Sequence, residues 1–171
     1  MKKYISIIFI TALVSLGFVA CDVETDEEAG GTKVQDMAGF WDVTVDAVKS
    51  DGTIEYTDPY GLGTISLQTF NTANDDVDSM WIYDAGHFYG MHFKVPVNYT
   101  AKTFSCDAKC YDPSAEGAGN AVITDGKILI GQGHNIHGLP TDSIYFKVKF
   151  DDDKYGLTYQ IAGTKHSGFS E

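Results

Sequence analysis

The chain of 171 residues contains no arginine, because all 12 of its basic residues are lysines. Arginine supplies the rigid guanidinium fork that grips carboxylates and phosphates at two points. Its absence argues against a phosphate or nucleotide site, although lysine and backbone amides can also bind such groups. The net charge of −12 repels nucleic acid and anionic lipid heads. The composition therefore favours a protein with no nucleic-acid partner.

The sequence also lacks the motifs of common catalytic and metal sites. It has no Gly-x-Ser-x-Gly elbow, and His166 and Ser167 are neighbours, which point to opposite faces of a strand. His134 and His137 lie in a Gly- and Pro-bounded loop with no helix to bring their rings together. Asp151–Asp153 lacks the spaced ligands of an EF-hand, so we expect a solvated turn there. We assign no catalytic residue, no metal site and no cofactor.

The N-terminus has the layout of a secretory signal. Lys2 and Lys3 precede Ile5–Val19, an almost unbroken apolar run of 15 residues that is too short for a comfortable bilayer span. A small residue, Ala20, then stands directly before Cys21, as in a bacterial lipoprotein signal. We expect cleavage before Cys21 and acylation of its thiol, which would anchor the protein to a membrane. The alternative is an ordinary signal peptide followed by a coincidental cysteine.

The rest of the chain divides into a tether and one domain. We expect residues 1–20 to be the signal peptide, residues 21–36 the acylated cysteine and a flexible acidic tether, and residues 37–171 the folded domain. Loss of residues 1–20 leaves 151 residues with a net charge of −14, which is one domain by length. The acidic residues after Cys21 resemble the surface-export signal of Bacteroidetes lipoproteins; a plain solvated linker is the alternative. Both readings place the protein in the cell envelope, at the outer membrane, on its periplasmic face or at the cell surface.

Short segments with a period of two residues fill the domain. No stretch shows the 3.6-residue period of a helix, and the 18 glycines and many β-branched and aromatic residues also favour strands. The expected strands are Trp41–Ala47, Ile65–Gln68, Ser79–Asp84, Phe88–Val97, Phe104–Cys110, Ala121–Ile123, Lys127–Ile130, Ile144–Phe150 and Gly156–Ala162, with turns at Ser50–Gly52 and Thr124–Gly126. The fold class is therefore all-β, an antiparallel meander of eight or nine strands that closes into a barrel or folds as a sandwich. An eight-stranded barrel is wide enough for one small ligand.

Cys106 and Cys110 lie four positions apart on one expected strand. At 3.3 Å per residue their Cα atoms would be about 13 Å apart, and a disulfide needs about 7 Å or less. We expect two small core residues; a tight hairpin joined by a disulfide is the alternative.

Aromatic residues crowd one half of the domain and occupy both faces of its strands. One face can pack in the core while the other lines a cavity or contacts a partner. The alternative is a second small core beneath a long loop at Asp51–Gly63. The candidate ligand-binding residues are Trp41, Tyr60, Trp81, Tyr83, Phe88 and Met91.

Several segments resemble the Bacteroidetes lipoproteins grouped as lipid-binding putative hydrolases. They are Met37–Ala47, Tyr56–Gly63, Phe70–Ala73, Met80-Trp81, Thr103–Ser105, Ile123–Ile128, Pro140–Ile144 and Gly163–Phe169. The resemblance implies a lipocalin-like β-barrel on a lipid anchor, and it brings no catalytic residues to this chain.

Three functions follow as hypotheses. The first is a lipid-anchored barrel that binds a small apolar or amphipathic, lipid-like molecule. The second is a surface adaptor that docks an envelope protein or a glycan through exposed aromatics. The third is a hydrolase of unknown substrate, for which this sequence supplies no machinery.

Overall fold

The computed structural model describes residues 30–110, 121–166 and 168, without the side chains of residues 107–110. Thr32–Glu171 forms one compact unit. Its described part contains strands and one short 3₁₀ helix, and no helix there is long and apolar enough to cross a bilayer. The elements are η1 (Gln35–Met37), β1 (Gly39–Val48), β2 (Ile54–Thr57), β3 (Ile65–Asn71), β4 (Ser79–Tyr83), β5 (His92–Asn98), β6 (Thr103–Cys110), β7 (Ala121–His134), β8 (Pro140–Phe150) and β9 (Thr158–Lys165).

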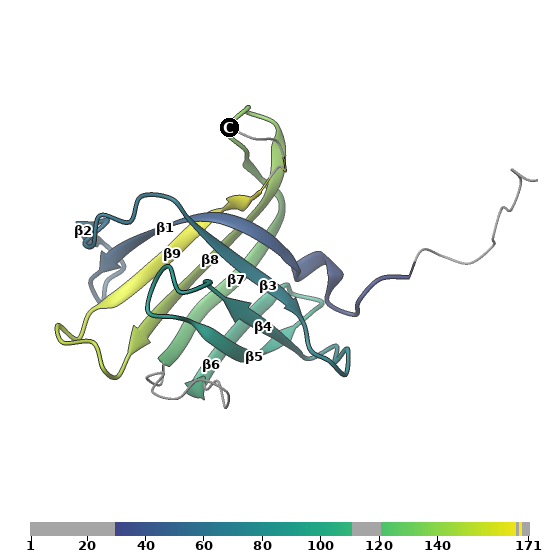
Figure 1. The fold of residues 1–171 in the computed structure, drawn as a ribbon, viewed down its shortest axis with the longest axis horizontal. Helices are drawn as coiled ribbons and strands as arrows, with labels where there is room; N and C mark the ends of the chain where they lie inside the picture. The colour runs from purple at the N-terminus through teal and green to yellow at the C-terminus, as the bar shows by residue number, and fades with distance from the viewer. Residues whose placement is uncertain (1–29, 111–120, 167, 169–171) are drawn as a thin grey trace, which may run out of the picture. The chain divides into compact units, whose positions relative to one another are not determined.

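Eight of the strands close into an antiparallel barrel (Figure 1). The sheet order is β2-β1-β3-β4-β5-β6-β7-β8-β9, and β1 also pairs with β9, from Trp41 opposite Lys165 to Val48 opposite Thr158. β2 is the ninth strand and lies outside the closed ring, on β1. The structure confirms the expected all-β meander, the number of strands and the barrel.

Alternating side chains explain why these segments form the wall of a barrel. In β1 and β8 every second residue points inward and is buried, and the residues between them face outward. One hydrophobic cluster runs through the interior, and its largest fully buried side chains are Trp41, Tyr159, Phe93, Phe146, Met37, Leu67 and Met80. The described interior is therefore a packed core.

The segment before β1 packs against one end of this core. Val34 and Met37 are fully buried, the Lys33 amide donates to the Asp75 carboxylate at 2.9 Å, and Lys102 pairs with Asp36 at 2.7 Å. Residues 32–36, the last part of the expected tether, thus belong to the compact unit.

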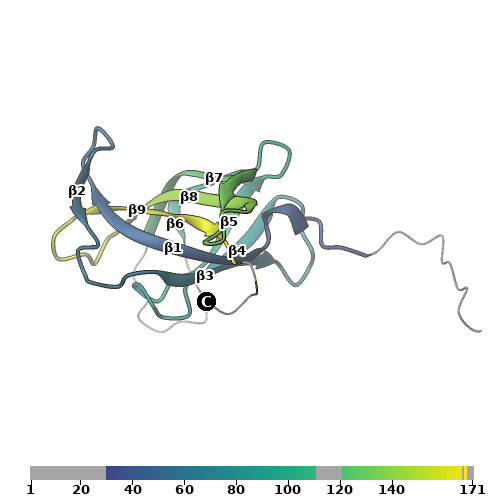
Figure 2. The ribbon, with the colours of Figure 1, turned by 90° about the horizontal axis from the view of Figure 1, so that it is seen from above.

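β1 is long enough to pair with two strands on the same side. Its first half, Gly39–Val43, pairs with β3, and its last residues, Asp46–Val48, pair with β2. The β1–β2 hairpin therefore stands out beyond the barrel (Figure 2). β2 was not among the expected strands, because it is only four residues long and none of its residues is buried.

Two expected strand boundaries are wrong. Phe88–Met91 is a loop, and β5 begins at His92, because Tyr89 and Gly90 have positive φ values of 54° and 60° that end extended structure. Thr124–Gly126 is a β-bulge and not a hairpin turn, so Ala121–Ile123 and Lys127–Ile130 are parts of one strand, β7. The bulge places an extra residue, Asp125, at a φ of 57° without reversing the chain.

The expectation for Cys106 is also wrong, because Cys106 is disulfide-bonded. The estimate of about 13 Å assumed a regular strand. However, Cys106 pairs with Ile123 and Cys110 with Ala121, so β6 advances four residues while β7 advances two. This irregularity shortens the path between the two cysteines. The side chain of Cys110 lies outside the described residues.

Candidate functional site

Aromatic rings gather at the barrel end that carries the loops after β4 and β8. We call this the tyrosine end, defined by Tyr60, Phe88, Tyr89, Phe150 and Tyr159. The Tyr89 and Phe150 rings stack at 4.1 Å between centroids, and Phe88 meets Tyr159 edge-on at 5.1 Å. Each such pair contributes about 0.5–1.5 kcal/mol beyond the area it buries. The rings thus hold the three loops of this end together.

Tyr60 reaches this cluster from a seven-residue excursion between β2 and β3. Asp58 shapes the excursion: its carboxylate accepts hydrogen bonds from the Leu62 amide at 2.7 Å and the Gly63 amide at 2.9 Å. The Asp58 amide in turn donates to the carboxylate of Asp46 on β1 at 3.0 Å. The Asp58 backbone has a φ of 42°, a conformation that Asp and Asn adopt more readily than most residues. One carboxylate therefore fixes the loop that carries Tyr60.

Hydroxyl groups join the rings into a polar chain. The hydroxyls of Tyr60 and Tyr159 share a hydrogen bond of 2.6 Å, and the Tyr89 hydroxyl donates to Asp153 at 2.9 Å. Burial raises the pKa of both Tyr89 and Tyr159, and their hydrogen bonds to Tyr60 raise it further. These hydroxyls stay neutral far above neutral pH.

Two buried carboxylates organise the loops beneath these tyrosines. Burial opposes ionisation of Asp153, but hydrogen bonds from the Leu157 and Tyr155 amides and from Tyr89 outweigh it, so the Asp153 pKa lies below its usual value. The expected solvated turn at 151–153 is thus wrong for Asp153, which is 9% exposed.

Asp84 plays the corresponding part in the loop after β4. Its carboxylate accepts from the Gly86 amide at 2.8 Å and from the Phe88 amide at 2.8 Å. Burial raises the pKa of Asp84, because these bonds offset only part of the lost hydration. Asp84 thereby positions Phe88 and Tyr89 at the tyrosine end.

A groove of about 940 Å³ opens at the tyrosine end, beside the excursion. We call it the mouth groove. Its lining comes from β2, the excursion and the loop after β8: Glu55, Tyr56, Thr57, Asp58, Pro59, Tyr60, Tyr155 and Leu157. A smaller hollow of about 220 Å³ adjoins it at Tyr60 and reaches Leu62, His87 and Phe88. Together they offer apolar walls with a few hydroxyls and carboxylates, as small-molecule sites do.

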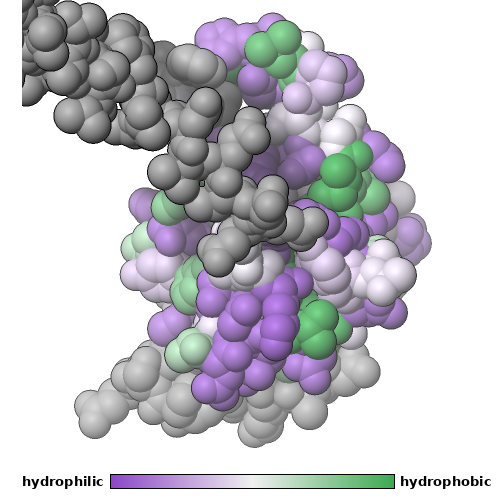
Figure 3. Space-filling model, turned by 90° about the vertical axis from the view of Figure 1, so that its right-hand side faces the viewer, coloured by the Kyte–Doolittle hydropathy of each residue, from purple (hydrophilic) through white to green (hydrophobic). Residues whose placement is uncertain are grey.

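The apolar groups at this end are exposed as well as clustered. Ile54 is 52% exposed, Tyr56 54%, Tyr60 43% and Tyr155 67%. On the side where η1 and the β3–β4 turn lie, Figure 3 instead shows separate hydrophobic residues (green) among mostly hydrophilic ones. Tyr56, Tyr60 and Tyr155 line one groove, and exposed apolar groups that cluster in this way mark an interaction site more often than single exposed residues do.

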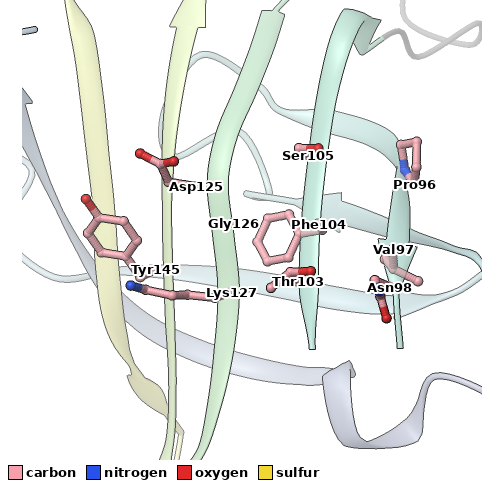
Figure 4. A pocket seen from close by; sticks show the side chains of 10 residues that line it. All are labelled: Pro96, Val97, Asn98, Thr103, Phe104, Ser105, Asp125, Gly126, Lys127 and Tyr145. Carbon is pink, nitrogen blue, oxygen red and sulfur yellow. The ribbon is translucent and has the colours of Figure 1, made fainter. Parts of the chain in front are cut away.

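A second hollow, of about 650 Å³, lies in the wall across β5, β6, β7 and β8 (Figure 4). It forms where β5 and β6 pair at only two described positions, Val97 with Phe104 and Asn98 with Thr103. Figure 4 shows Tyr145, Lys127, Thr103 and Asn98 in a row across it, and the Lys127 ammonium lies 4.9 Å from the centre of the Tyr145 ring. Half of its ten lining residues are polar or charged, and it offers two aromatic rings against three in the mouth groove, so it suits an apolar molecule less well.

The six candidate residues from the sequence lie in three different places. Tyr60 and Phe88 meet at the tyrosine end, with ring centroids 5.9 Å apart, and Met91 is fully buried at the end of the same loop. Trp81 and Tyr83 lie on the outer wall, where both rings contact His92.

Trp41 lies inside the barrel near η1. Its indole Nε1 donates to the Thr69 hydroxyl at 2.8 Å, and that hydroxyl donates to the Met37 carbonyl at 2.6 Å. The geometry therefore gives Trp41 a part in holding η1 on the barrel. The structure does not gather the six residues into one pocket.

Sequence reasoning did not name five residues of this end as candidates: Tyr89, Phe150, Asp153, Tyr155 and Tyr159. Tyr159 lies 99 positions from Tyr60, and Asp153 lies 64 positions from Tyr89, so only the register of the barrel brings them together. The sequence does contain two tyrosine pairs with the same spacing, Tyr56 and Tyr60 and Tyr155 and Tyr159, but it does not show that the two pairs meet in the fold.

The other polar groups named from the sequence do not form a metal site in the described structure. His134 and His137 are exposed in the β7–β8 turn, and no group of three or more described His, Cys, Asp or Glu side chains is suited to a metal ion. His166 contacts the Asp42 carboxylate at 2.9 Å, and Ser167 lies outside the described residues.

The structure is a closed antiparallel barrel with an aromatic groove at one end. The sequence profile of the family described as lipid-binding putative hydrolase matches residues 26–170. The chain belongs to this family, and its barrel is that of a lipid-binding protein. No curated protein matches it.

Proposed function

We propose that the protein is anchored to the cell envelope by lipid and holds an amphipathic, lipid-like molecule in the mouth groove. The observation that carries this proposal is the groove itself, an exposed, largely aromatic space of about 940 Å³ fixed by Asp58 and Asp153. Membership of a lipid-binding family supports the class of ligand. The packed interior favours a site at the mouth over one in the centre of the barrel.

The aromatic rings would supply most of the attraction. Tyr56, Tyr60 and Tyr155 line the groove. The Tyr60 hydroxyl is already hydrogen-bonded to Tyr159, so the hydroxyls of Tyr56 and Tyr155 are the ones that would meet a polar head. Tyrosine suits such a boundary because it offers an apolar body and a polar tip. An alkyl chain would lie along the rings while its head stays in water.

Binding is tested with a fluorescent alkyl probe that carries a neutral polar head, and with the chain from residue 21 onward carrying Cys21→Ser. We expect saturable binding that Tyr60→Ala weakens, because this change removes a ring shared by the mouth groove and the hollow beside it. Trp81→Ala is the matched control, since Trp81 lies on the outer wall. An equal loss of probe affinity in both variants, or no saturable binding by the unsubstituted groove, would contradict the proposal.

The anchor is tested separately in cells. The motif Ala20-Cys21 and the preceding apolar run support acylation at Cys21. Wild-type protein should incorporate an alkyne-labelled fatty acid and sediment with outer membranes. Cys21→Ser should lose the label and leave the membrane fraction, and retention of the label would disprove the assignment.

The exposed β2 strand favours a second function, that of an adaptor for an envelope protein. Ile54 and Tyr56 are exposed, and among the described strands β2 pairs only with β1. An unpaired strand edge can add a strand from another chain. A photo-crosslinking residue at Ile54 should then capture a defined partner in cells, whereas one at Ile136, which is more exposed than Ile54, should not.

A further inference from the structure

The charges around the mouth groove restrict the head group of the ligand. Two carboxylates, Glu55 and Asp58, lie on the groove, and no described residue of its lining is basic. The whole chain carries a net charge of −12. An anionic head would therefore enter a field of its own sign, and a cationic head would be drawn into it.

The tyrosines of the groove favour the same kind of head group. Tyr56, Tyr60 and Tyr155 line the groove, and the negative face of an aromatic ring attracts ammonium and, above all, quaternary ammonium groups. The protein already shows this preference at Tyr155, because the Lys154 ammonium lies 5.5 Å from the centre of its ring. Several rings with adjacent carboxylates form the usual surroundings of a bound alkylammonium group.

From this geometry we infer that the mouth groove selects amphiphiles with a cationic, ammonium-type head over amphiphiles with a carboxylate head. The inference rests on the proposed function, since it names the class of ligand for the same groove. The alkyl chain would pack on Tyr60 and Leu157, and the head would lie between the tyrosine rings and Glu55.

Asp58 is less suited than Glu55 to test this inference. Its two carboxylate oxygens already accept from the Leu62 and Gly63 amides, so a change at Asp58 would alter the loop as well as the charge. Glu55 lies on β2, and its side chain is exposed. Glu55→Gln therefore removes one charge while keeping the size of the side chain.

The experiment compares three dodecyl amphiphiles below their micellar concentrations: the trimethylammonium, the carboxylate and the neutral maltoside. Affinities are measured by titration calorimetry at neutral pH with the chain from residue 21 onward carrying Cys21→Ser. We expect the trimethylammonium to bind about ten-fold more tightly than the carboxylate, with the maltoside between them. High salt should narrow this difference.

Three variants separate local from general charge. Glu55→Gln should lower trimethylammonium affinity about three-fold and leave maltoside affinity unchanged. Asp78→Asn changes the net charge equally at the β3–β4 turn and should change neither affinity. Tyr155→Leu keeps an apolar side chain but removes a ring, so it should weaken the trimethylammonium more than the maltoside.

The outcomes are distinguishable. Equal affinity for all three heads would overturn the head-group inference and leave the proposed function standing. Preference for the carboxylate, lost in Lys154→Gln, would show that Lys154 reads an anion and would also overturn it. Binding of none of the three would remove the proposed function and the inference together.

Discussion

At the scale of single residues, the hydroxyl chain of the tyrosine end should make the folded protein lose stability at alkaline pH. Tyr89 and Tyr159 have pKa values raised in the folded protein, chiefly by burial. Their neutral forms are therefore favoured in the folded state. This contribution is complete below the pKa of an unfolded tyrosine, about 10, and is lost as the pH rises above it.

We expect these two tyrosines to ionise only as the protein unfolds. An alkaline titration followed by tyrosinate absorbance should show an early phase from exposed tyrosines and a late one that coincides with loss of circular dichroism. Tyr159→Phe should reduce the late phase. A single smooth phase near pH 10 would contradict the assignment.

Gly163 allows β9 to approach β1 closely. It pairs with Val43 on β1 and Ile144 on β8, and an added Cβ would overlap the Asp42 carbonyl oxygen and lie 2.6 Å from the Val43 Cα. Backbone cannot move aside as a flexible side chain can.

Gly163→Ala should therefore lower the free energy of unfolding by about 1–3 kcal/mol, the usual cost of overpacking. Gly30→Ala is the control, because an added Cβ there meets nothing within 4 Å. Urea unfolding measures both variants, and equal midpoints would show that β1 and β9 can separate without cost.

At the scale of elements, the excursion between β2 and β3 depends on Asp58. Asp58→Ala removes the acceptor for two amides and also disfavours the backbone φ of 42°. Asp58→Asn keeps one acceptor and tolerates that φ, and Asp58→Gly keeps only the backbone freedom.

The loss of stability should therefore be largest for Asp58→Ala, smaller for Asp58→Gly and smallest for Asp58→Asn. Hydrogen bonds to charged groups contribute about 1.5–3 kcal/mol, and we expect Asp58→Ala to cost about 2 kcal/mol in urea unfolding. Limited proteolysis should cut residues 58–64 in the Ala variant before the Asn variant. If all three variants resist proteolysis equally, the loop is held by Tyr60 and not by Asp58.

The sequence predicted those elements whose inner and outer faces differ. β1 and β8 alternate buried and outward residues, so their period of two was visible. β2 is exposed on both faces, and its alternation of Ile54 and Tyr56 with Glu55 and Thr57 spans only four residues. Phe88–Met91 is apolar on both faces, as a buried strand would be, but positive φ values at Tyr89 and Gly90 make it a loop. Backbone conformation of this kind is set by Asp84 and leaves no periodic signal.

The candidate site was predicted less well than the fold. To predict a site, one must know how the strands pair and which face each residue occupies, and not only where the strands lie. Of the six candidate residues, Tyr60 and Phe88 lie together in one cluster, but Trp81 and Tyr83 face the outer wall. Met80 and Ile82 are the inward residues of β4, and they alternate with these two aromatics. Large apolar side chains on both faces concealed which face was inside.

At the scale of the whole molecule, one core joins the two ends of the barrel. The hydrophobic cluster includes Met37 and Trp41 near η1 and Phe150 and Tyr159 at the tyrosine end. β1 also runs between the ends and pairs along its length with β9. We therefore expect both ends to unfold in one cooperative transition.

The two tryptophans of the chain make this testable. In Trp81→Phe, fluorescence reports on Trp41 alone, while near-ultraviolet circular dichroism is dominated by tyrosines, many of them at the other end. The two signals should share one urea midpoint. If the tyrosine end unfolded before the rest of the barrel, the circular dichroism midpoint would lie at a lower urea concentration than the fluorescence midpoint. A ligand that binds only the folded groove should then raise both urea midpoints together. At a concentration one hundred times its dissociation constant, it should raise the free energy of unfolding by about 2.7 kcal/mol. A rise in the tyrosine signal alone would mean that the groove is an independently folding part, and that the packed core plays no role in binding.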